Sequence, residues 1–330
     1  MNKLNVVIIS PALAKANNGN WQTAYRWARF LQPYFKVTLA QQWDEAAADV
    51  MIALHARRSA ASIAAFAAAQ PKSPLVVVLT GTDLYKDIRC DAAAQKSLQL
   101  ATHLVVLQAE GLQELSSNLQ KKTQVIYQSA RLLKPISLAE KNQKIYFDVC
   151  MVGHLRDEKD PLTFMRAAAA VQSANVRLWH IGGVLDQVLG AQAEATQAQH
   201  PRYHWLDNMP HAATRQHIKR SHLMVIASKM EGGANVIIEA ITSGVPVLAS
   251  DISGNRGMLG ANYAGYFPLG DSVQLAALID RAESDENFYA HLHRQCVARK
   301  KLFTPQQECA ALLKLLNHAL KDTHEFPSKK

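Results

Sequence analysis

The sequence predicts an α/β protein built from two doubly wound parallel sheets, one in each half of the chain. Short apolar runs alternate with longer amphipathic segments along the 330 residues, which is typical of β-α units on a parallel sheet. The runs are rich in Val, Ile and Leu without polar alternation, as expected for strands covered on both faces. The length exceeds what one hydrophobic core usually serves, so we expect two Rossmann-like domains with a cleft between them.

The first half supplies six apolar runs that predict the strands of an N-terminal sheet. They are Asn5–Ile9, Lys36–Ala40, Val50–Leu54, Leu75–Leu79, Leu104–Leu107 and Gln124–Tyr127. Helical patterns fall between them, for example over Asn20–Leu31 and Ala60–Ala69. A polar linker over Leu138–Lys144 then interrupts the alternation, so the first domain is expected to cover residues 1–145.

A second series of runs predicts the sheet of a C-terminal domain over residues 146–304. The predicted strands are Phe147–Val152, Val176–Ile181, His204–Leu206, Leu223–Ala227, Val247–Ala249 and Gly265–Pro268. The predicted helices are Pro161–Gln172, Ala213–Arg220, Asn235–Thr242, Ser272–Ser284 and Phe288–Lys301. The closing segment Pro305–Leu320 has its leucines on one side and predicts a final helix.

Composition narrows the classes of protein to consider. With 48% hydrophobic and 19% charged residues, the chain reads as an ordinary globular protein. No apolar run reaches the roughly 18 residues of a membrane span, and the N-terminus lacks a small-residue cleavage site. The four cysteines lie far apart without metal-ligand spacing. We therefore expect a cytoplasmic location, no stable membrane association and no bound metal.

Positive charge is concentrated in the first half. Residues 1–145 hold 17 Lys and Arg against 9 Asp and Glu, a net +8, whereas residues 146–330 hold 19 against 18. This asymmetry favours an anionic ligand. The basic residues are scattered, with no RNP-like aromatic pattern and no zinc-finger spacing. Nucleic acid is therefore not an expected partner, and a solvated basic face is the plainer alternative.

Two cations follow the first strand of the second series. In the segment 153–161, Gly153 permits a tight turn and Pro161 suits the first turn of a helix. Arg156 offers a bidentate fork and Lys159 a point charge, so together they suit a diphosphate. A surface turn with solvated charges is the alternative interpretation.

The segment 228–239, with the sequence SKMEGGANVIIE, carries a second signal. A predicted strand is followed by a glycine pair and then by a predicted helix. The start of this helix directs backbone N–H groups and the positive end of the helix dipole outwards. Glu231 and Glu239 are carboxylates that accept hydrogen bonds from sugar hydroxyls, one from a hexose and the other from a ribose. A helix N-terminus that favours an acidic residue would explain Glu231 alone. The loop residues expected to bind a phosphate-bearing donor are Gly232, Gly233, Ala234 and Asn235.

Three loops after strands of the first half predict an acceptor site. The residues expected to contact the acceptor are Gly19, Asn20, His55, Arg57, Arg58, Thr82 and Asp83. Two guanidinium forks and an imidazole can surround a small phosphate-like anion. The alternative is that one arginine pairs with Asp83 or Asp87 and the other is solvated.

With these motifs, the sequence resembles the retaining GT-B glycosyltransferases that share an E-x7-E motif. Glu231 and Glu239 match the two glutamates, and Arg156 with Lys159 matches the cationic pair. The resemblance covers essentially the whole chain, although the usual Glu-Gly-Phe-Gly loop reads Glu-Gly-Gly-Ala-Asn here. It implies a UDP-sugar donor, catalytic roles for Arg156, Lys159 and Glu231, and donor contacts from Gly153 and Glu239. It also implies that residues 305–330 return to the N-terminal domain.

Several strings, among them LHARRSAASI, LTGTDLYKD and MEGGANVIIEA, are similar to one branch of that family, the selenosugar synthases of selenoneine biosynthesis. This resemblance implies that selenophosphate attacks a UDP-N-acetylglucosamine-like donor to give a selenosugar and UDP. It also implies transfer of the product to a downstream enzyme of the pathway. Because Arg156 and Lys159 neutralise the leaving diphosphate, no metal or other cofactor is expected.

Three rival functions fit the same motifs. An ordinary glycosyltransferase would use a hydroxyl acceptor, and would favour acceptor loops richer in aromatic or apolar groups. A nucleotide-sugar epimerase or hydrolase would need no acceptor. A noncatalytic nucleotide-sugar sensor would need neither acceptor nor catalytic residues. Two further histidines, His103 and His180, are expected to be packed, with the border of the donor site as the alternative place for His180.

Overall fold

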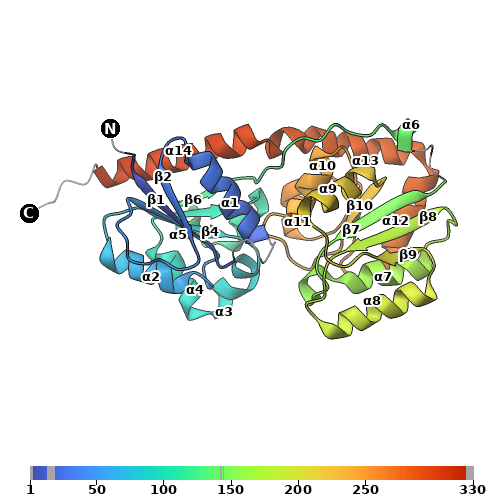
Figure 1. Ribbon diagram of the computed structural model, residues 1–330, viewed down its shortest axis with the longest axis horizontal. Coiled ribbons are helices and arrows are strands. Elements are labelled where there is room, and N and C mark those ends of the chain that lie inside the picture. Colours follow the sequence, from blue (N-terminus) through green and yellow to red (C-terminus); the bar gives the residue numbers. More distant parts are fainter. Residues whose placement is uncertain (1–2, 13–18, 142, 144, 325–330) are drawn as a thin grey trace, which may run out of the picture. The chain divides into compact units, whose positions relative to one another are not determined.

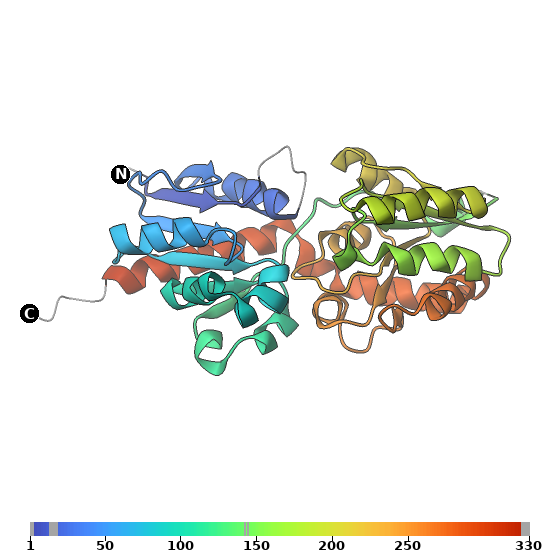
Figure 2. The same cartoon turned by 90° about the horizontal axis from the view of Figure 1, so that it is seen from below.

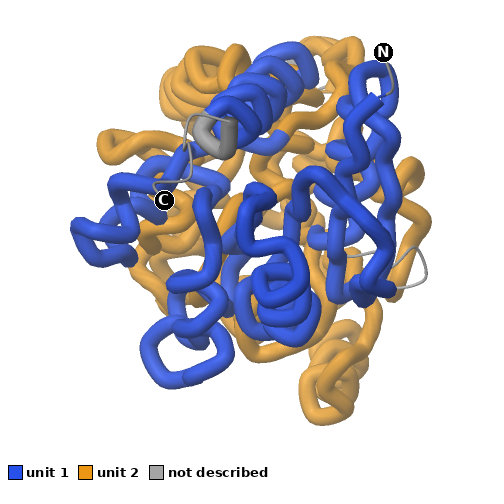
Figure 3. The backbone as a smooth tube through the Cα atoms, turned by 90° about the vertical axis from the view of Figure 1, so that its left-hand side faces the viewer, with its two compact units in different colours: residues 1–128, 305–330 blue, residues 129–304 orange. Residues whose placement is uncertain are grey.

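Each half of the chain folds around its own parallel sheet. The computed structural model describes residues 3–12, 19–141, 143 and 145–324. The chain divides into two compact units, unit 1 with residues 1–128 and 305–330, and unit 2 with residues 129–304 (Figure 3). Each unit has a six-stranded sheet with helices on both faces (Figures 1 and 2). The predicted α/β fold class with two doubly wound sheets is therefore confirmed.

The sheet of unit 1 has the strand order β2-β1-β3-β4-β5-β6, and all neighbouring strands are parallel. The strands are β1 (Asn5–Ile9), β2 (Lys36–Ala40), β3 (Val50–Leu54), β4 (Leu75–Leu79), β5 (His103–Val106) and β6 (Thr123–Val125). The helices are α1 (Gly19–Leu31), α2 (Ala60–Ala69), α3 (Ile88–Cys90), α4 (Ala92–Leu100), α5 (Ser117–Gln120) and α14 (Pro305–His324). All six predicted strands of the first half are present, within two residues at each end.

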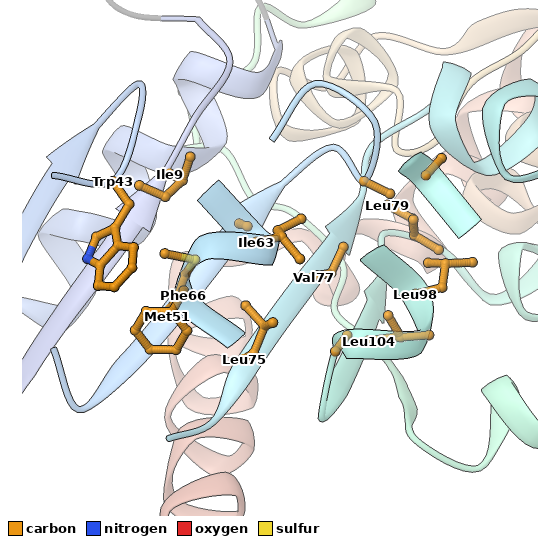
Figure 4. Close-up of a cluster of buried hydrophobic side chains, with 14 of the residues drawn as sticks. Ile9, Trp43, Met51, Ile63, Phe66, Leu75, Val77, Leu79, Leu98 and Leu104 are labelled. Carbon is orange, nitrogen blue, oxygen red and sulfur yellow. The ribbon is translucent and has the colours of Figure 1, made fainter. Parts of the chain in front are cut away.

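The unit 1 sheet is covered on both faces, which explains its unbroken apolar strands. On one face, Phe66 of α2 and Leu98 of α4 pack with Met51 and Val77 of the sheet (Figure 4). On the other face, α1 and α14 cover the sheet with buried leucines and Trp27. Glu308 of α14 is buried and accepts hydrogen bonds from Trp27 Nε1 at 2.7 Å and from the guanidinium of Arg26 at 2.7 and 2.9 Å. This buried, fully paired carboxylate holds α14 to α1.

The sheet of unit 2 has the order β12-β11-β10-β7-β8-β9, again all parallel. The strands are β7 (Phe147–Val152), β8 (Val176–Ile181), β9 (Tyr203–Trp205), β10 (Leu223–Ile226), β11 (Val247–Ser250) and β12 (Tyr266–Phe267). The helices are α6 (Leu138–Lys141), α7 (Pro161–Ala170), α8 (Gln187–Gln199), α9 (His211–Arg220), α10 (Asn235–Thr242), α11 (Ser253–Leu259), α12 (Ser272–Ser284) and α13 (Glu286–Arg299). Helix α7 packs against α8 and α12, and α10 packs against α9 and α13.

The segment before β7 differs from the linker that the sequence predicts. Ser137 and Glu140 form a reciprocal cap, in which Glu140 Oε2 accepts from the Ser137 amide at 2.9 Å and the Glu140 amide donates to Ser137 Oγ at 3.2 Å. This cap starts α6, and residues 142 and 144 of the linker lie outside the described residues. The Leu133 amide donates to the carbonyl of Thr242 at 3.2 Å. Such contacts group residues 129–145 with unit 2, whereas the sequence analysis ended the first domain at residue 145.

Burial makes His180 a source of pH-dependent stability in unit 2. Its Nδ1 lies 2.7 Å from the hydroxyl of Tyr203, and desolvation lowers the pKa of His180 to about 4. The unfolded chain binds a proton at about pH 6.5, so stability falls as the pH drops from 6.5 towards 4. We expect this group to cost about 3 kcal/mol between pH 7 and pH 4. Denaturant unfolding at pH 7 and at pH 4 measures this loss of stability. The loss should be about 3 kcal/mol smaller in His180→Phe than in the wild type. Equal losses in the two proteins would contradict this assignment.

Candidate active site

The strand order of unit 2 marks where a ligand binds in a doubly wound sheet. Strands β7 and β10 are hydrogen-bonded neighbours, yet β8 and β9 come between them in the chain. The chain winds to one side from β7 and to the other side from β10, which makes a topological switch point. The loop after β7 (residues 153–160) and the loop after β10 (residues 227–234) both start at this point. These are the loops in which the sequence predicts the donor-binding residues.

Charged side chains join these two loops. The Lys159 ammonium donates to Glu231 Oε1, which also accepts from Ser228 Oγ at 2.6 Å. Lys229 adds a second link between the loops. Its amide donates a hydrogen bond to the carbonyl of Glu158 at 2.9 Å, and its ammonium lies 2.5 Å from the carboxylate of Asp157. The Lys159–Glu231 pair is mostly buried, whereas the Lys229–Asp157 pair is exposed. The structure thus brings together two of the predicted catalytic residues, 72 positions apart in sequence.

Arg156 lies in the same loop as Lys159, and its guanidinium has N–H donors available for a ligand. Its side chain is partly exposed, and its nearest carboxylate is Glu158, at 3.9 Å from Nε. That Nε is buried and has no hydrogen-bond partner among the described residues. A buried guanidinium N–H without an acceptor is costly, so an anion bound here would satisfy it. Together with the remaining N–H groups of Lys159, this leaves a cationic site for an anionic ligand.

Two glycines allow neighbouring backbone segments to approach each other closely at the carboxyl edge of the unit 2 sheet. A Cβ on Gly182 would lie 1.9 Å from the carbonyl oxygen of Gly153, so only glycine fits at the end of β8. A Cβ on Gly254, in the first turn of α11, would lie 2.1 Å from the carbonyl oxygen of Glu231. Ser250 Oγ donates to the carbonyl of Ser228 at 2.7 Å, which fixes the same loop from β11. The position of Glu231 is therefore determined by the following strand and helix.

The second glutamate of the motif has a different partner. Glu239 lies in the second turn of α10, is mostly buried, and its Oε1 is 2.6 Å from Nε2 of His211 at the start of α9. Gly232, Gly233 and Ala234 precede α10, and Asn235 begins it. The first turn of an α-helix leaves backbone N–H groups without intrahelical acceptors, and these can bind an anion. Within the described residues, no hydrogen bond or ion pair joins Glu239 to Lys159 or Glu231.

His154 lies in the same loop as Arg156 and Lys159, and it was not among the predicted site residues. Its Nδ1 accepts a hydrogen bond from the Gly183 amide at 3.1 Å. Burial lowers the pKa of His154, and the positive charges of Arg156 and Lys159 lower it further. The neutral ring therefore carries its proton on Nε2 and adds another N–H donor to the loop. His211 and Gly254 were also missed, because nothing in the local sequence indicates their contacts with Glu239 and Glu231.

In unit 1, three of the predicted acceptor residues meet after β3 and β4. His55 directly follows β3 with a left-handed φ of 72°, a conformation that is strained for a histidine. Its Nε2 lies 3.1 Å from the hydroxyl of Thr82. The carboxylate of Asp83 accepts from the amides of Thr80, Gly81 and Ala56, each at 2.9 Å. Asp83 is fully buried, so it holds the two loops in place.

The two arginines after His55 differ in their surroundings. Arg57 Nε donates to the carboxylate of Asp87 at 2.8 Å, and this partner raises the pKa of Arg57. The side chain of Arg58 is exposed and forms no ion pair within the described ranges of unit 1. Burial lowers the pKa of His55, opposed by the charge of Asp83, so the ring is predominantly neutral. This is the arrangement that the sequence analysis gave as its alternative, with one arginine paired and the other solvated.

The first predicted acceptor loop is described only in part. Residues 13–18 lie outside the described residues, and Gly19 and Asn20 are the first two residues of α1. Trp21, the residue after Asn20, stacks on Tyr25 about one turn further along α1, with their ring centroids 5.3 Å apart. Tyr25 is 46% exposed, and the guanidinium of Arg29 lies 6.0 Å from its ring centroid. Helix α1 thus presents aromatic surface next to Gly19 and Asn20.

The described residues provide neither a cluster of metal ligands nor a helix that could span a membrane. Among the residues that the structure describes, no three His, Cys, Asp or Glu side chains are grouped so that they could hold a metal ion. Over the same residues, every helix is too short or too polar to cross a bilayer.

Comparisons with known proteins agree with this architecture. The family model for glycosyl transferases group 1 matches residues 133–300. A curated relative, glycosyltransferase 1 domain-containing protein 1 of Xenopus tropicalis, is 32% identical over 129 residues, which are 38% of this chain. The match spans only 37% of that relative's length.

Solved structures extend the likeness to both units. Anabaena HepE in complex with UDP-glucose has a TM-score of 0.74 at 15% identity, over 96% of this chain and 100% of that one. Sucrose-phosphate synthase from Thermosynechococcus elongatus has a TM-score of 0.78 at 16% identity, over 97% and 100%. At such low identity these likenesses show the fold, which is the GT-B fold expected from the sequence. The family model covers half of the chain, and the chain therefore belongs to the group 1 family of glycosyl transferases.

Proposed function

We propose that this glycosyltransferase uses a UDP-sugar as its donor and selenophosphate as its acceptor. The observation that carries the donor assignment is the buried, unpartnered Nε of Arg156 beside the Lys159–Glu231 pair. A diphosphate would accept hydrogen bonds from Arg156, Lys159 and the amides of Gly232–Asn235 at the start of α10. HepE, which shares the fold, is described in complex with UDP and with UDP-glucose.

In the proposed reaction the bond between sugar C1 and the β-phosphate oxygen breaks, and UDP leaves with the electron pair. Selenium of selenophosphate donates the pair that forms the new bond to C1, and the phosphoryl group is later lost to water. Arg156 and Lys159 would stabilise the charge that grows on UDP, which is the kind of preorganised electrostatic effect that dominates many active sites. Selenophosphate is already ionised near neutral pH, so His55 would position it and need not act as a base.

The acceptor assignment is supported by charge in unit 1. Arg58 is exposed and unpaired among the described residues, and it follows His55 at the carboxyl edge of the sheet. Arg57 is already neutralised by Asp87, so Arg58 is the guanidinium available to a small anion. The Thr82 hydroxyl, which contacts His55, would add a further hydrogen bond.

A hydroxyl acceptor is a second candidate, favoured by the stacked Trp21–Tyr25 pair on α1. Exposed aromatic rings offer flat apolar surface to the face of a sugar ring. A selenophosphate site needs no such surface.

One assay distinguishes these functions from one another. The protein is incubated with UDP-N-acetylglucosamine or UDP-glucose in the presence of selenophosphate, of a sugar acceptor or of neither, and UDP release is followed. Release that depends on selenophosphate supports the proposal, whereas release that depends on a sugar hydroxyl supports the second candidate. Release without any acceptor would indicate a hydrolase, and no release under any condition would indicate a sensor.

Glu239→Ala should mainly weaken UDP binding, by about tenfold. A ribose hydrogen bond is made equally in the ground state and the transition state, so turnover at saturating donor should change little. Calorimetry of UDP binding and a steady-state assay give the two quantities. An unchanged UDP affinity with a large loss of turnover would contradict the ribose role.

A further inference from the structure

A basic cavity lies in unit 1, and none of its lining residues is among those predicted to bind the donor or the acceptor. Its volume is about 550 Å³, which is within the range of small-molecule sites. It is lined by Pro71, Lys72, Thr102, His103, Lys121, Lys122, Thr123, Gln124, His318 and Ala319. Three lysines and two histidines are among these residues, and no acidic side chain is. The lining alone therefore favours an anionic ligand.

The topology places this cavity at the opposite edge of the sheet from His55 and Thr82. Apart from His318 and Ala319 on α14, its residues lie just before or at the start of β4, β5 and β6, whereas His55 and Thr82 follow the carboxyl ends of β3 and β4. The strands are parallel, and β4 has five residues. At about 3.3 Å per residue, the two edges of the sheet are separated by roughly 15 Å. A ligand in the cavity would therefore not compete for the residues at the carboxyl edge.

The lysines of the cavity differ in whether their ammonium groups already have hydrogen-bond partners. Lys72 and Lys121 are exposed, and neither side chain forms an ion pair or hydrogen bond within the described part of the chain. Lys122 donates to the carbonyls of Leu98 and Ala101 at 2.8 and 2.6 Å, which caps the end of α4 and leaves one N–H. Burial lowers the pKa of Lys122, and a bound anion would oppose that shift.

The imidazoles of the cavity come from two elements. His103 begins β5 and His318 lies on α14, with their ring centroids 5.9 Å apart. Thr102 Oγ1 donates to the carbonyl of Leu75 and accepts from the Leu75 amide. His103 Nδ1, 3.0 Å from that oxygen, is therefore the donor of the pair. The cavity thus has cationic or hydrogen-bonding groups on several sides, together with the apolar atoms of Pro71 and Ala319.

We propose that this cavity binds a small soluble molecule that carries phosphate groups. Phosphate oxygens accept hydrogen bonds from ammonium groups, and the ammonium groups of Lys72 and Lys121 can balance part of the negative charge of a diphosphate. The site is a cavity of ligand size, which fits a free molecule better than a phosphate within a membrane surface.

Calorimetric titration with inorganic pyrophosphate tests the proposal. Lys72→Gln and Lys121→Gln should each weaken binding about tenfold, because each removes one charge-assisted contact. Lys36→Gln is the matched control, since Lys36 is an exposed lysine on the edge strand β2, with β1 and β3 between β2 and β4. The same titration in the Arg156→Ala, Lys159→Ala double variant removes both cations from the loops of unit 2, and the cavity should still bind pyrophosphate in that variant.

Three results would overturn the proposal. Affinity that is unchanged in both Lys72→Gln and Lys121→Gln would show that pyrophosphate binds elsewhere. An equal loss in Lys36→Gln would show a general effect of net charge. Cosedimentation with phosphatidic acid vesicles that depends on Lys72 and Lys121, without pyrophosphate binding, would assign the cavity to a lipid surface.

Discussion

Lys159→Ala should lower turnover about 100-fold or more while the protein remains folded. The ammonium would stabilise the charge that develops on the leaving UDP, an interaction that is strongest in the transition state. Its loss would also leave the carboxylate of Glu231, which is 9% exposed, with Ser228 as its remaining side-chain donor. Steady-state UDP release at saturating donor measures the effect, and thermal unfolding checks that the variant is folded.

Lys229→Ala is the matched control for this prediction. Lys229 joins the same two loops through Asp157, but its ion pair is exposed and contributes little to stability. Its amide bond to Glu158 is retained in the variant, because it is made by the backbone. Turnover should therefore stay close to that of the wild type. Equal losses in the two variants would show that loop attachment, and not transition-state charge, explains the effect.

Arg58→Ala should raise the apparent KM for selenophosphate about ten- to a hundredfold and leave UDP affinity nearly unchanged. Losing one charge-assisted contact costs roughly 1.5–3 kcal/mol, and Arg58 is the arginine of its loop without a carboxylate partner among the described residues. Arg57→Ala should have a smaller effect on this KM, because its guanidinium is engaged by Asp87. Initial rates at varied selenophosphate give both values.

Salt provides an internal check on the role of Arg58. Raising the ionic strength should weaken selenophosphate use in the wild type, and less so in Arg58→Ala, where the screened charge is already absent. An Arg58→Ala variant that keeps its KM for selenophosphate but loses UDP affinity would contradict the proposed roles of the two units.

The strands could be predicted well because parallel strands buried on both faces leave a simple signal. Val50–Leu54 and Leu75–Leu79 are wholly buried and were located to the residue. Helix α8 (Gln187–Gln199) was missed, because it buries only Leu189, Gly190 and Ala193 and its sequence has no strong apolar stripe. A Cβ on Gly190 would approach the Val184 side chain to 3.0 Å, so a larger residue there would require that side chain to shift. A short helix such as α6 depends on a local cap, which a reading based on apolar periodicity does not reveal.

The candidate site could be predicted as a set of residues but not as a set of contacts. The spacing of Glu231 and Glu239, and the cations at 156 and 159, are properties of local sequence. The Lys159–Glu231 pair and the His211–Glu239 pair join positions 72 and 28 residues apart, so only the folded sheet shows them. The same holds for Arg57, because its ion pair with Asp87 depends on how the turn after β4 folds.

The central claim is that the loops after β7 and β10 bind a nucleoside diphosphate. It is tested most directly by calorimetric titration of the protein with UDP and with UMP. We expect UDP to bind at least about tenfold more tightly than UMP, because the β-phosphate gains charge-assisted contacts with Arg156 and Lys159. In the Arg156→Ala, Lys159→Ala double variant this difference should disappear. Equal affinities for UDP and UMP in the wild type, or a difference that survives in the double variant, would contradict the account.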